Sequence, residues 1–286
     1  PFERKRMVGR KALSRILGVP EREVDLVRYL YAVELWVLFL AQGRLRNCIE
    51  SLRESGSPAR CPGDLRIPSL GAGAEDLDRL AARLTFGDVM SQPSGENPAH
   101  DFGCHIERLV PKQIRHTTGA YFTPSWLADE LVEQVLTRSD GQHTDAQRFL
   151  EPSCGPGVFL CSLVRSLVQR DLIDARADLA ANGTLIAYEF NDLWAFVAQV
   201  SLLELQVSLA RTNGLALQDL SWHRCVLVRD FLEDAIDREL RGPAESRQLN
   251  LLESAPASTD QAVDERFDVI LGNPPWINWE HLPSDY

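Results

Sequence analysis

The chain has 286 residues, of which 44% are hydrophobic and 25% are charged, and this composition excludes a disordered or fibrous protein. A chain of this length folds as one large domain or two small ones. The formal net charge of −11 counts mildly against DNA binding by these residues alone, because proteins that grip DNA usually present a basic face.

The cysteines, the histidines and the longest apolar run exclude further classes of protein. The six cysteines contain no Cys-x-x-Cys pair and the six histidines form no ligand set, so we expect neither a metal site nor a disulfide framework. The basic N-terminus lacks the apolar core of a signal peptide. The apolar run 29–41 is interrupted by Glu34 and is too short to span a bilayer. We therefore expect a cytoplasmic protein with reduced thiols and no membrane partner.

Residues 1–110 are predicted to form a mainly helical N-terminal region. Apolar residues recur with helical periodicity over 21–54, and a second helical pattern covers 75–90. Loops rich in Gly, Pro and Ser are predicted over 55–74, with a further loop over 91–100.

The remainder, residues 111–286, alternates between helical and strand patterns. Helices are predicted over 126–138, 157–171 and 193–210, and apolar strands over 148–151, 184–189, 224–228 and 267–271. The polar run 242–265 indicates a surface insertion. This alternation is typical of an α/β domain in which a parallel sheet carries helices on both faces.

A turn of small residues follows the first predicted strand. The sequence Glu151-Pro152-Ser153-Cys154-Gly155-Pro156-Gly157 joins that strand to the next helix. Ligands of doubly wound sheets bind just beyond the carboxyl ends of the strands, and the two glycines allow a close ligand approach that a Cβ would block. Leu160 stands where a dinucleotide fingerprint has its third glycine, which disfavours NAD. The turn by itself is also compatible with a tight turn that binds nothing.

Two later strands end in residues suited to a nucleoside. Glu189 ends the second strand and can accept hydrogen bonds from both ribose hydroxyls. After the third strand, Asp230 can accept from an exocyclic amine and Phe231 can stack on a purine. Each signal is weak alone, since an exposed acid at a strand end is common.

The most specific motif is the loop Asn273-Pro274-Pro275-Trp276, directly after the fourth strand. An adenine N6 amine is a poor nucleophile because its lone pair is delocalised into the ring. Two acceptors aimed at its N–H groups, the Asn273 side-chain oxygen and the Pro274 carbonyl, favour a pyramidal and more nucleophilic nitrogen. The consecutive prolines stiffen the loop, and Trp276 offers a plane for a base taken out of the duplex. The alternative is a proline-rich turn with a core tryptophan.

A fifth segment, Gly119-Ala120-Tyr121-Phe122-Thr123-Pro124, precedes the helix predicted over 126–138. In this order the five segments resemble motifs X, I, II, III and IV of the gamma-class adenine-N6 DNA methyltransferases. The resemblance covers roughly residues 112–286 and implies a Rossmann-like class I methyltransferase sheet with S-adenosylmethionine as the cofactor. Trp276 replaces the tyrosine that is commoner in the family.

The resemblance also implies a role for each matching residue. The cofactor pocket would be lined by Tyr121, Thr123, Glu151, Pro152, Ser153, Gly155, Gly157 and Glu189. Asp230 and Phe231 would hold the adenine of the cofactor. Asn273, Pro274, Pro275 and Trp276 would form the catalytic loop around a flipped adenine of double-stranded DNA. Neither a general base nor a metal is required, because the sulfonium methyl donor is already activated and positioning carries most of the catalysis.

Two other functions stay open. Protein-glutamine and RNA methyltransferases share Asn-Pro-Pro-aromatic loops, and a subunit could bind S-adenosylmethionine without turnover. The acid-Pro-Ser-Cys-Gly turn and the upstream segment favour the DNA family, whose restriction-modification and phage-defence systems contain candidate partner subunits. That family continues after the loop with more strands and a recognition domain, so we expect these residues to be a fragment whose sheet is incomplete at the C-terminus.

Overall fold

The computed structural model describes residues 26–55, 97–109, 122–138, 147–180, 184–217, 220, 225–236 and 266–274. The helix predicted over 75–90 and the insertion predicted over 242–265 lie outside these residues. The boundary predicted between residues 110 and 111 also lies outside them, so the division into two regions stays a prediction.

Four strands form one sheet with the order β3-β2-β1-β4. They are β1 (Phe149–Glu151), β2 (Leu185–Glu189), β3 (Val226–Val228) and β4 (Val269–Ile270). Every pairing is parallel, with Glu151 opposite Ala187 and Leu150 opposite Ile270. All four lie within the predicted strands, and the α/β class is confirmed as a small parallel sheet with helices. The chain order reverses between β1 and β4, which makes the gap between these strands the topological switch point where such sheets bind ligands.

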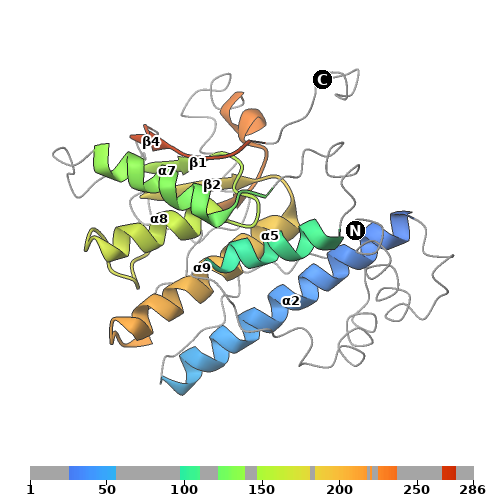
Figure 1. The fold of residues 1–286 in the computed structure, drawn as a ribbon, viewed down its shortest axis with the longest axis horizontal. Helices are drawn as coiled ribbons and strands as arrows, with labels where there is room; N and C mark the ends of the chain where they lie inside the picture. Colours follow the sequence, from blue (N-terminus) through green and yellow to red (C-terminus); the bar gives the residue numbers. More distant parts are fainter. Residues whose placement is uncertain are drawn as a thin grey trace, which may run out of the picture.

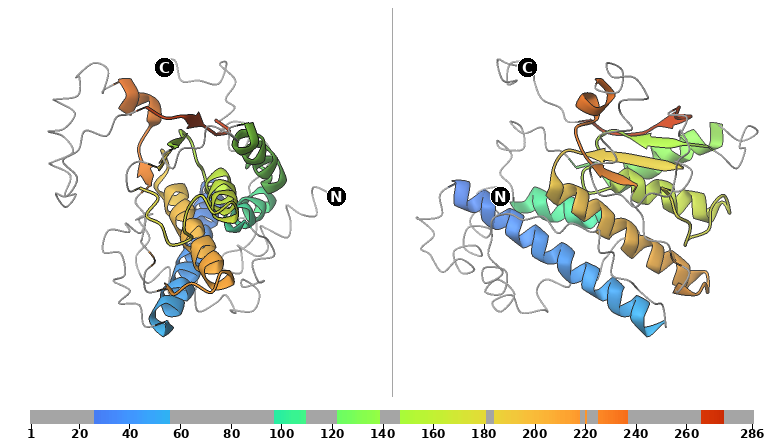
Figure 2. Two further views of the ribbon diagram at one scale, coloured as in Figure 1. Left: turned by 90° about the vertical axis from the view of Figure 1, so that its left-hand side faces the viewer. Right: turned by 180° about the vertical axis from the view of Figure 1, so that it is seen from behind.

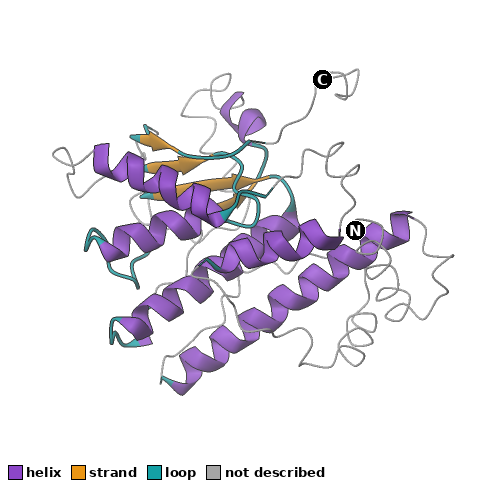
Figure 3. Cartoon of the chain, viewed as in Figure 1, coloured by secondary structure: helices purple, strands orange, loops and turns teal. Residues whose placement is uncertain are grey.

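Three helices lie side by side on one face of this sheet (Figures 1 and 2). They are α7 (Ser125–Arg138), α8 (Val158–Gln169) and α9 (Asp192–Thr212), close to their predicted bounds. The helix α8 is buried almost all round, and α5, α7 and α9 all contact it. Within the described residues these helices cover one face, as Figure 3 shows, so a helical layer on the second face stays a prediction.

The N-terminal helices pack beneath this layer, on the side away from the sheet (Figure 1). The helix α2 (Leu26–Glu54) contacts α9, and α5 (Pro98–Leu109) contacts both α9 and α8. Buried side chains from α2 and α5 belong to the same hydrophobic cluster as those of the sheet and its helices. The described helices of the N-terminal region therefore share one core with the sheet.

The helix α5 corrects the end of the loop predicted over 91–100, because residues 98–100 are helical, while residues 91–96 lie outside the described residues. Its start has a physical signal, because the Asn97 side-chain oxygen accepts a hydrogen bond from the His100 backbone N–H at 3.2 Å, as an N-cap does. Pro98 then occupies the first helical position, where a missing N–H costs nothing. In the sequence, the pair Asn97-Pro98 is typical of a turn. The structure has a helix there because Ala99 and Phe102 pack into the core.

The helix α9 is the central core helix of the molecule. Asn191 caps it, since its side-chain oxygen accepts from the backbone N–H groups of Leu193 at 2.9 Å and Trp194 at 3.2 Å. By length and composition it could cross a membrane, but 72% of its most apolar stretch is buried inside the structure. Its apolar character therefore reflects burial between the sheet, α8 and α2.

Candidate cofactor and base-binding site

The carboxyl ends of β1, β2 and β4 meet at one place. The turn after β1 contacts the end of β2, since the Gly155 N–H donates to the Glu189 carboxylate at 2.8 Å. The segment after β4 lies against the same turn, because a Cβ built on Gly272 would lie 3.4 Å from Pro152 and 3.9 Å from Glu151. Predicted site residues at the ends of three separate strands are thus neighbours at the switch point.

The two glycines of the turn differ in their surroundings. Both have positive φ, +53° at Gly155 and +91° at Gly157, which explains glycine at each position. A Cβ on Gly155 would meet nothing within 4 Å, whereas one on Gly157 would lie 3.2 Å from the Ala198 Cβ and 3.3 Å from its Cα. Gly155 therefore faces open space, and Gly157 allows α8 to start close against α9. Contact of Gly157 with a cofactor stays a prediction.

Glu189 is held by backbone groups at the end of β2. Its two carboxylate oxygens accept from the N–H groups of Gly155 and Asn191, each at 2.8 Å. Burial raises the pKa of the Glu189 carboxyl, and the N–H groups of Asn191, Gly155 and Phe190 partly oppose that rise. The carboxylate is therefore fixed in orientation beside the turn, with lone pairs left on both oxygens for further donors.

Glu151 and Ser153 carry the polar atoms that most suggest a ligand. Glu151 is only 3% exposed, and its Oε2 has no hydrogen-bond partner among the described residues. The Ser153 hydroxyl is likewise buried without a partner in that part of the chain. Burial, and then the nearby Glu189 charge, raise the pKa of the Glu151 carboxyl well above its usual range. Buried polar atoms normally have partners, so these two fit a ligand with hydrogen-bond donors or a positive charge.

S-adenosylmethionine fits this chemistry. It carries an ammonium group, ribose hydroxyls and a sulfonium, which could supply donors or positive charge to the buried oxygens of Glu151 and Ser153. Gly155 leaves open space beside the same atoms. The residues present therefore suit the cofactor that the sequence predicts.

Asp230 and Phe231 lie after β3, next to the same end of the sheet. One oxygen of Asp230 accepts from the N–H groups of Leu232 at 2.8 Å and Glu233 at 3.2 Å, so Asp230 caps the short helix 231–236. The Phe231 ring meets the Tyr188 ring edge-on, with centroids 5.2 Å apart. Capping and packing account for both residues, and their contact with an adenine stays a prediction.

The loop after β4 is described as far as Pro274. Asn273 is half-buried, and its side-chain Nδ2 donates to the Thr123 hydroxyl oxygen at 3.2 Å. This contact joins the predicted catalytic loop to the predicted cofactor segment before α7. Pro275, Trp276 and Tyr121 lie outside the described residues.

Cys154 lies inside the turn but is not suited to nucleophilic chemistry. It is buried, and burial, followed by the charges of Glu151 and Glu189, raises the pKa of its thiol well above the ordinary value. The thiol therefore stays protonated and acts as a small packing group. Among the described residues no three His, Cys, Asp or Glu side chains lie together as a metal site would require.

Two residues near the site were missed in the sequence. Phe190 follows Glu189 directly and is 75% exposed, and its signal was a large apolar residue just after a strand-end acid. His100 on α5 accepts a hydrogen bond from the Ser125 N–H through its Nδ1 at 3.3 Å. Nothing in the sequence indicated His100, because the contact joins two helices that no motif relates.

Comparisons with known proteins give one distant structural similarity. No family model matches the chain, and no curated protein matches it. A chain in the cryo-EM structure of a DrdV–DNA complex is similar at 15% sequence identity, with a TM-score of 0.42. The match covers 96% of this chain and 29% of that chain, so the present chain spans less than a third of its length.

Proposed function

We propose that this chain is the cofactor-binding and base-positioning part of an adenine-N6 DNA methyltransferase that uses S-adenosylmethionine. The observation that carries the proposal is the close approach of Gly272, the residue before Asn273, to the turn at Glu151 and Pro152. A methyl donor bound at that turn would lie beside the group that holds the acceptor nitrogen. Transfer of a methyl group needs this proximity above all.

The cofactor would be held by the residues at the ends of β1 and β2. Glu189, fixed by two backbone N–H groups, would accept from the ribose hydroxyls. Glu151 and Ser153 would direct their buried oxygens to donors of the methionine part. When bound, S-adenosylmethionine supplies a methyl group already activated by its sulfonium charge.

The target amine would be held by Asn273 and Pro274. The amide oxygen of Asn273 and the carbonyl of Pro274 would accept from the two N–H groups of the N6 amine, which directs the nitrogen lone pair outward. The prolines at 274 and 275 restrict the loop, so that the acceptors need little rearrangement when the base arrives. Trp276 would stack on a flipped adenine of double-stranded DNA.

The proposal extends to the surroundings of the enzyme. The enzyme would belong to a restriction-modification or phage-defence system in the cytoplasm, with further subunits or domains that choose the DNA sequence. Such partners would offset the net charge of −11, which counts mildly against DNA binding by these residues alone. Recognition would then depend on basic surfaces outside the described residues.

The test is methyl transfer from labelled S-adenosylmethionine to genomic DNA by the full-length protein, followed by nucleoside analysis. Wild type should form N6-methyladenine, and Asn273→Ala should lower the rate by about 100-fold or more, the usual effect of losing one preorganised polar contact. Calorimetry should show nearly unchanged cofactor affinity for that variant. Asn213→Ala, at the exposed far end of α9, is the matched control and should keep wild-type activity.

The same experiment separates the alternatives. Label in RNA or in glutamine side chains, without label in DNA, would replace DNA by that substrate. Cofactor binding without methyl transfer to DNA, RNA or protein would indicate a non-catalytic binding subunit. Wild-type rates in Asn273→Ala would remove Asn273 from the chemistry.

A further inference from the structure

We propose that Thr123 is a positioning residue that orients the side-chain amide of Asn273, and that the N-terminal helix α5 holds Thr123 in place. This inference rests on the proposed function. It gives Thr123 a different role from the cofactor contact that the resemblance implies, and it gives α5 a part in the active site.

The first step is the contact between the two side chains. Thr123 is buried, at 8% exposure, and its hydroxyl oxygen accepts from Asn273 Nδ2 at 3.2 Å. An asparagine amide has a donor nitrogen on one side and an acceptor oxygen on the other. With the nitrogen directed at Thr123, the oxygen points away from Thr123. The contact ties the Asn273 side chain to the segment before α7, with the amide nitrogen on the side of Thr123.

The orientation matters because only the oxygen can accept from the target amine. An amide turned by half a revolution would present its own N–H groups to the N–H groups of the base, and no hydrogen bond could form. Thr123 therefore acts through Asn273, without touching the base. By accepting from the amide nitrogen, its hydroxyl leaves the amide oxygen directed away from Thr123, where that oxygen can accept from an amine.

The second step is the support of the Thr123 segment by α5. His100 Nδ1 accepts from the Ser125 N–H at 3.3 Å, which fixes the start of α7 two residues after Thr123. Gly103 of α5 lies so close to Phe122 that a Cβ there would be 3.0 Å from the Phe122 Cβ. Phe122 also meets the Trp194 ring edge-on, with centroids 5.2 Å apart. The residues on both sides of Thr123 are thus held by α5 and α9.

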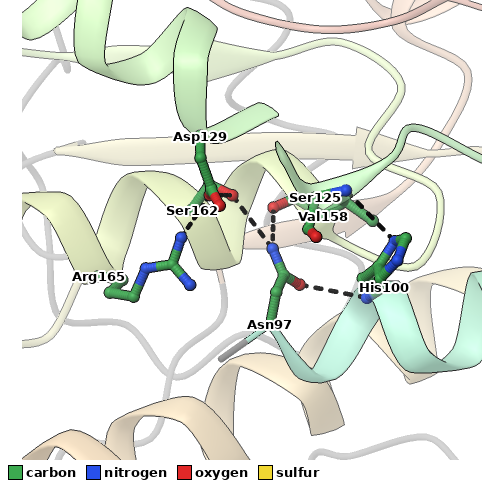
Figure 4. Close-up of polar contacts among 7 residues, drawn as sticks. All are labelled: Asn97, His100, Ser125, Asp129, Val158, Ser162 and Arg165. Carbon is green, nitrogen blue, oxygen red and sulfur yellow. Dashed lines mark hydrogen bonds and ion pairs between the residues drawn. The ribbon is translucent and has the colours of Figure 1, made fainter. Parts of the chain in front are cut away.

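The third step is the anchor of α5 itself (Figure 4). Asn97, only 3% exposed, donates through Nδ2 to the Val158 carbonyl at 3.0 Å and to the Ser162 hydroxyl at 3.1 Å. Ser162 in turn donates to Asp129 of α7 at 2.6 Å, and Arg165 forms an ion pair with the same carboxylate. This partly buried network joins the start of α5 to α7 and α8, so the start of α5 cannot shift without disturbing the helix that follows Thr123.

The experiment compares Thr123→Val, which keeps the shape and removes the hydroxyl, with Thr123→Ser, which keeps the hydroxyl. We expect Thr123→Val to lower kcat by about 10- to 100-fold, as a misdirected group does, with KM for DNA and the cofactor Kd within about twofold of wild type. Thr123→Ser should restore most of the kcat lost in Thr123→Val. Thr123→Ser loses the buried methyl group that Thr123→Val keeps, so a role in packing alone would lower kcat in Thr123→Ser and spare Thr123→Val.

A second measurement does not depend on turnover. The side-chain NH2 signals of Asn273, identified by their loss in Asn273→Ala, should shift in the NMR spectrum of Thr123→Val and keep their wild-type positions in Thr123→Ser. Unchanged signals in Thr123→Val would overturn the proposal, even if the wild-type protein methylates no adenine. Weaker cofactor binding by Thr123→Val at unchanged kcat would also overturn it, since Thr123 would then be a cofactor ligand. Absence of N6-methyladenine with wild type, together with the expected NMR shifts, would refute the proposed function alone.

Discussion

The turn after β1 contains two glycines, Gly155 and Gly157, whose alanine variants should differ. One variant should disturb the packing of the helices, and the other should obstruct the ligand. Replacing either by alanine adds one methyl group to a residue with positive φ. The backbone strain of about 1–2 kcal/mol and the unfolded-state gain of about 0.4–1 kcal/mol are common to both variants. The difference between the variants therefore reports what each new methyl group meets.

The structure gives the sign and size of that difference. The methyl group of Gly157→Ala would lie 3.2 Å from the Ala198 Cβ and 3.3 Å from its backbone Cα, so α8 and α9 must move apart. Overpacking of this kind costs about 1–3 kcal/mol. The methyl group of Gly155→Ala meets no atom within 4 Å. Gly157→Ala should thus be less stable than Gly155→Ala by about 1–3 kcal/mol.

The assay is thermal and denaturant unfolding of both variants in the same buffer. The expected difference corresponds to a Tm lower by about 2–12 °C in Gly157→Ala, at about 2–4 °C per kcal/mol for a chain of this size class. Calorimetry with S-adenosylmethionine should give the opposite order, with the larger loss of affinity in Gly155→Ala, whose methyl group enters the proposed pocket. Equal stability of the two variants would refute the packing role of Gly157.

Two further predictions follow from buried polar groups. The raised pKa of Glu151 means that the folded protein keeps a proton that the unfolded chain has lost above about pH 4.5, so stability should fall as pH rises from there. Glu151→Gln should flatten the profile of Tm against pH, and an unchanged slope would show that Glu151 is not the group responsible. Asn97→Ala should cost about 1–3 kcal/mol in denaturant unfolding, because it removes an N-cap and leaves the buried Ser162 hydroxyl and Val158 carbonyl short of a donor. Asn191→Ala, which removes an exposed N-cap on α9, is its control and should cost about 1 kcal/mol; an equal loss in both would assign Asn97 to capping alone.

Much of the sheet could be predicted from the sequence because its strands are short apolar runs with recognisable ends. The first two runs end in a glutamate, Asp230 comes two residues after the third, and Gly272 follows the fourth directly. Strands buried in a parallel sheet are also apolar on both faces. The helix α5 was missed for the opposite reason. Its residues are polar on average, its glycine at 103 weakens the helical pattern, and only packing against α8 and α9 makes the helix favourable.

The proximity of the candidate residues could be predicted, but the hydrogen bonds among them could not. Strand-end residues of a parallel sheet must share one edge, so Glu151, Glu189 and Asn273 could be grouped in advance. Their hydrogen-bond partners could not be predicted, because Gly155 donates to Glu189 across 34 positions of sequence and Asn273 donates to Thr123 across 150. No local pattern specifies which hydroxyl faces which amide at such separations.

Gly157 shows how a motif read without its spatial neighbours can mislead. A Gly-x-Gly turn after a strand suggests that both glycines make room for a ligand, since both precede a helix at the binding edge. The conformational reason holds at both positions, because both have positive φ. The steric surroundings of the two glycines differ. A Cβ on Gly157 would face Ala198 of α9, whereas a Cβ on Gly155 would face open space. A motif can therefore keep its residues for two different reasons, and only Gly155 is expected to alter cofactor affinity more than stability when a methyl group is added.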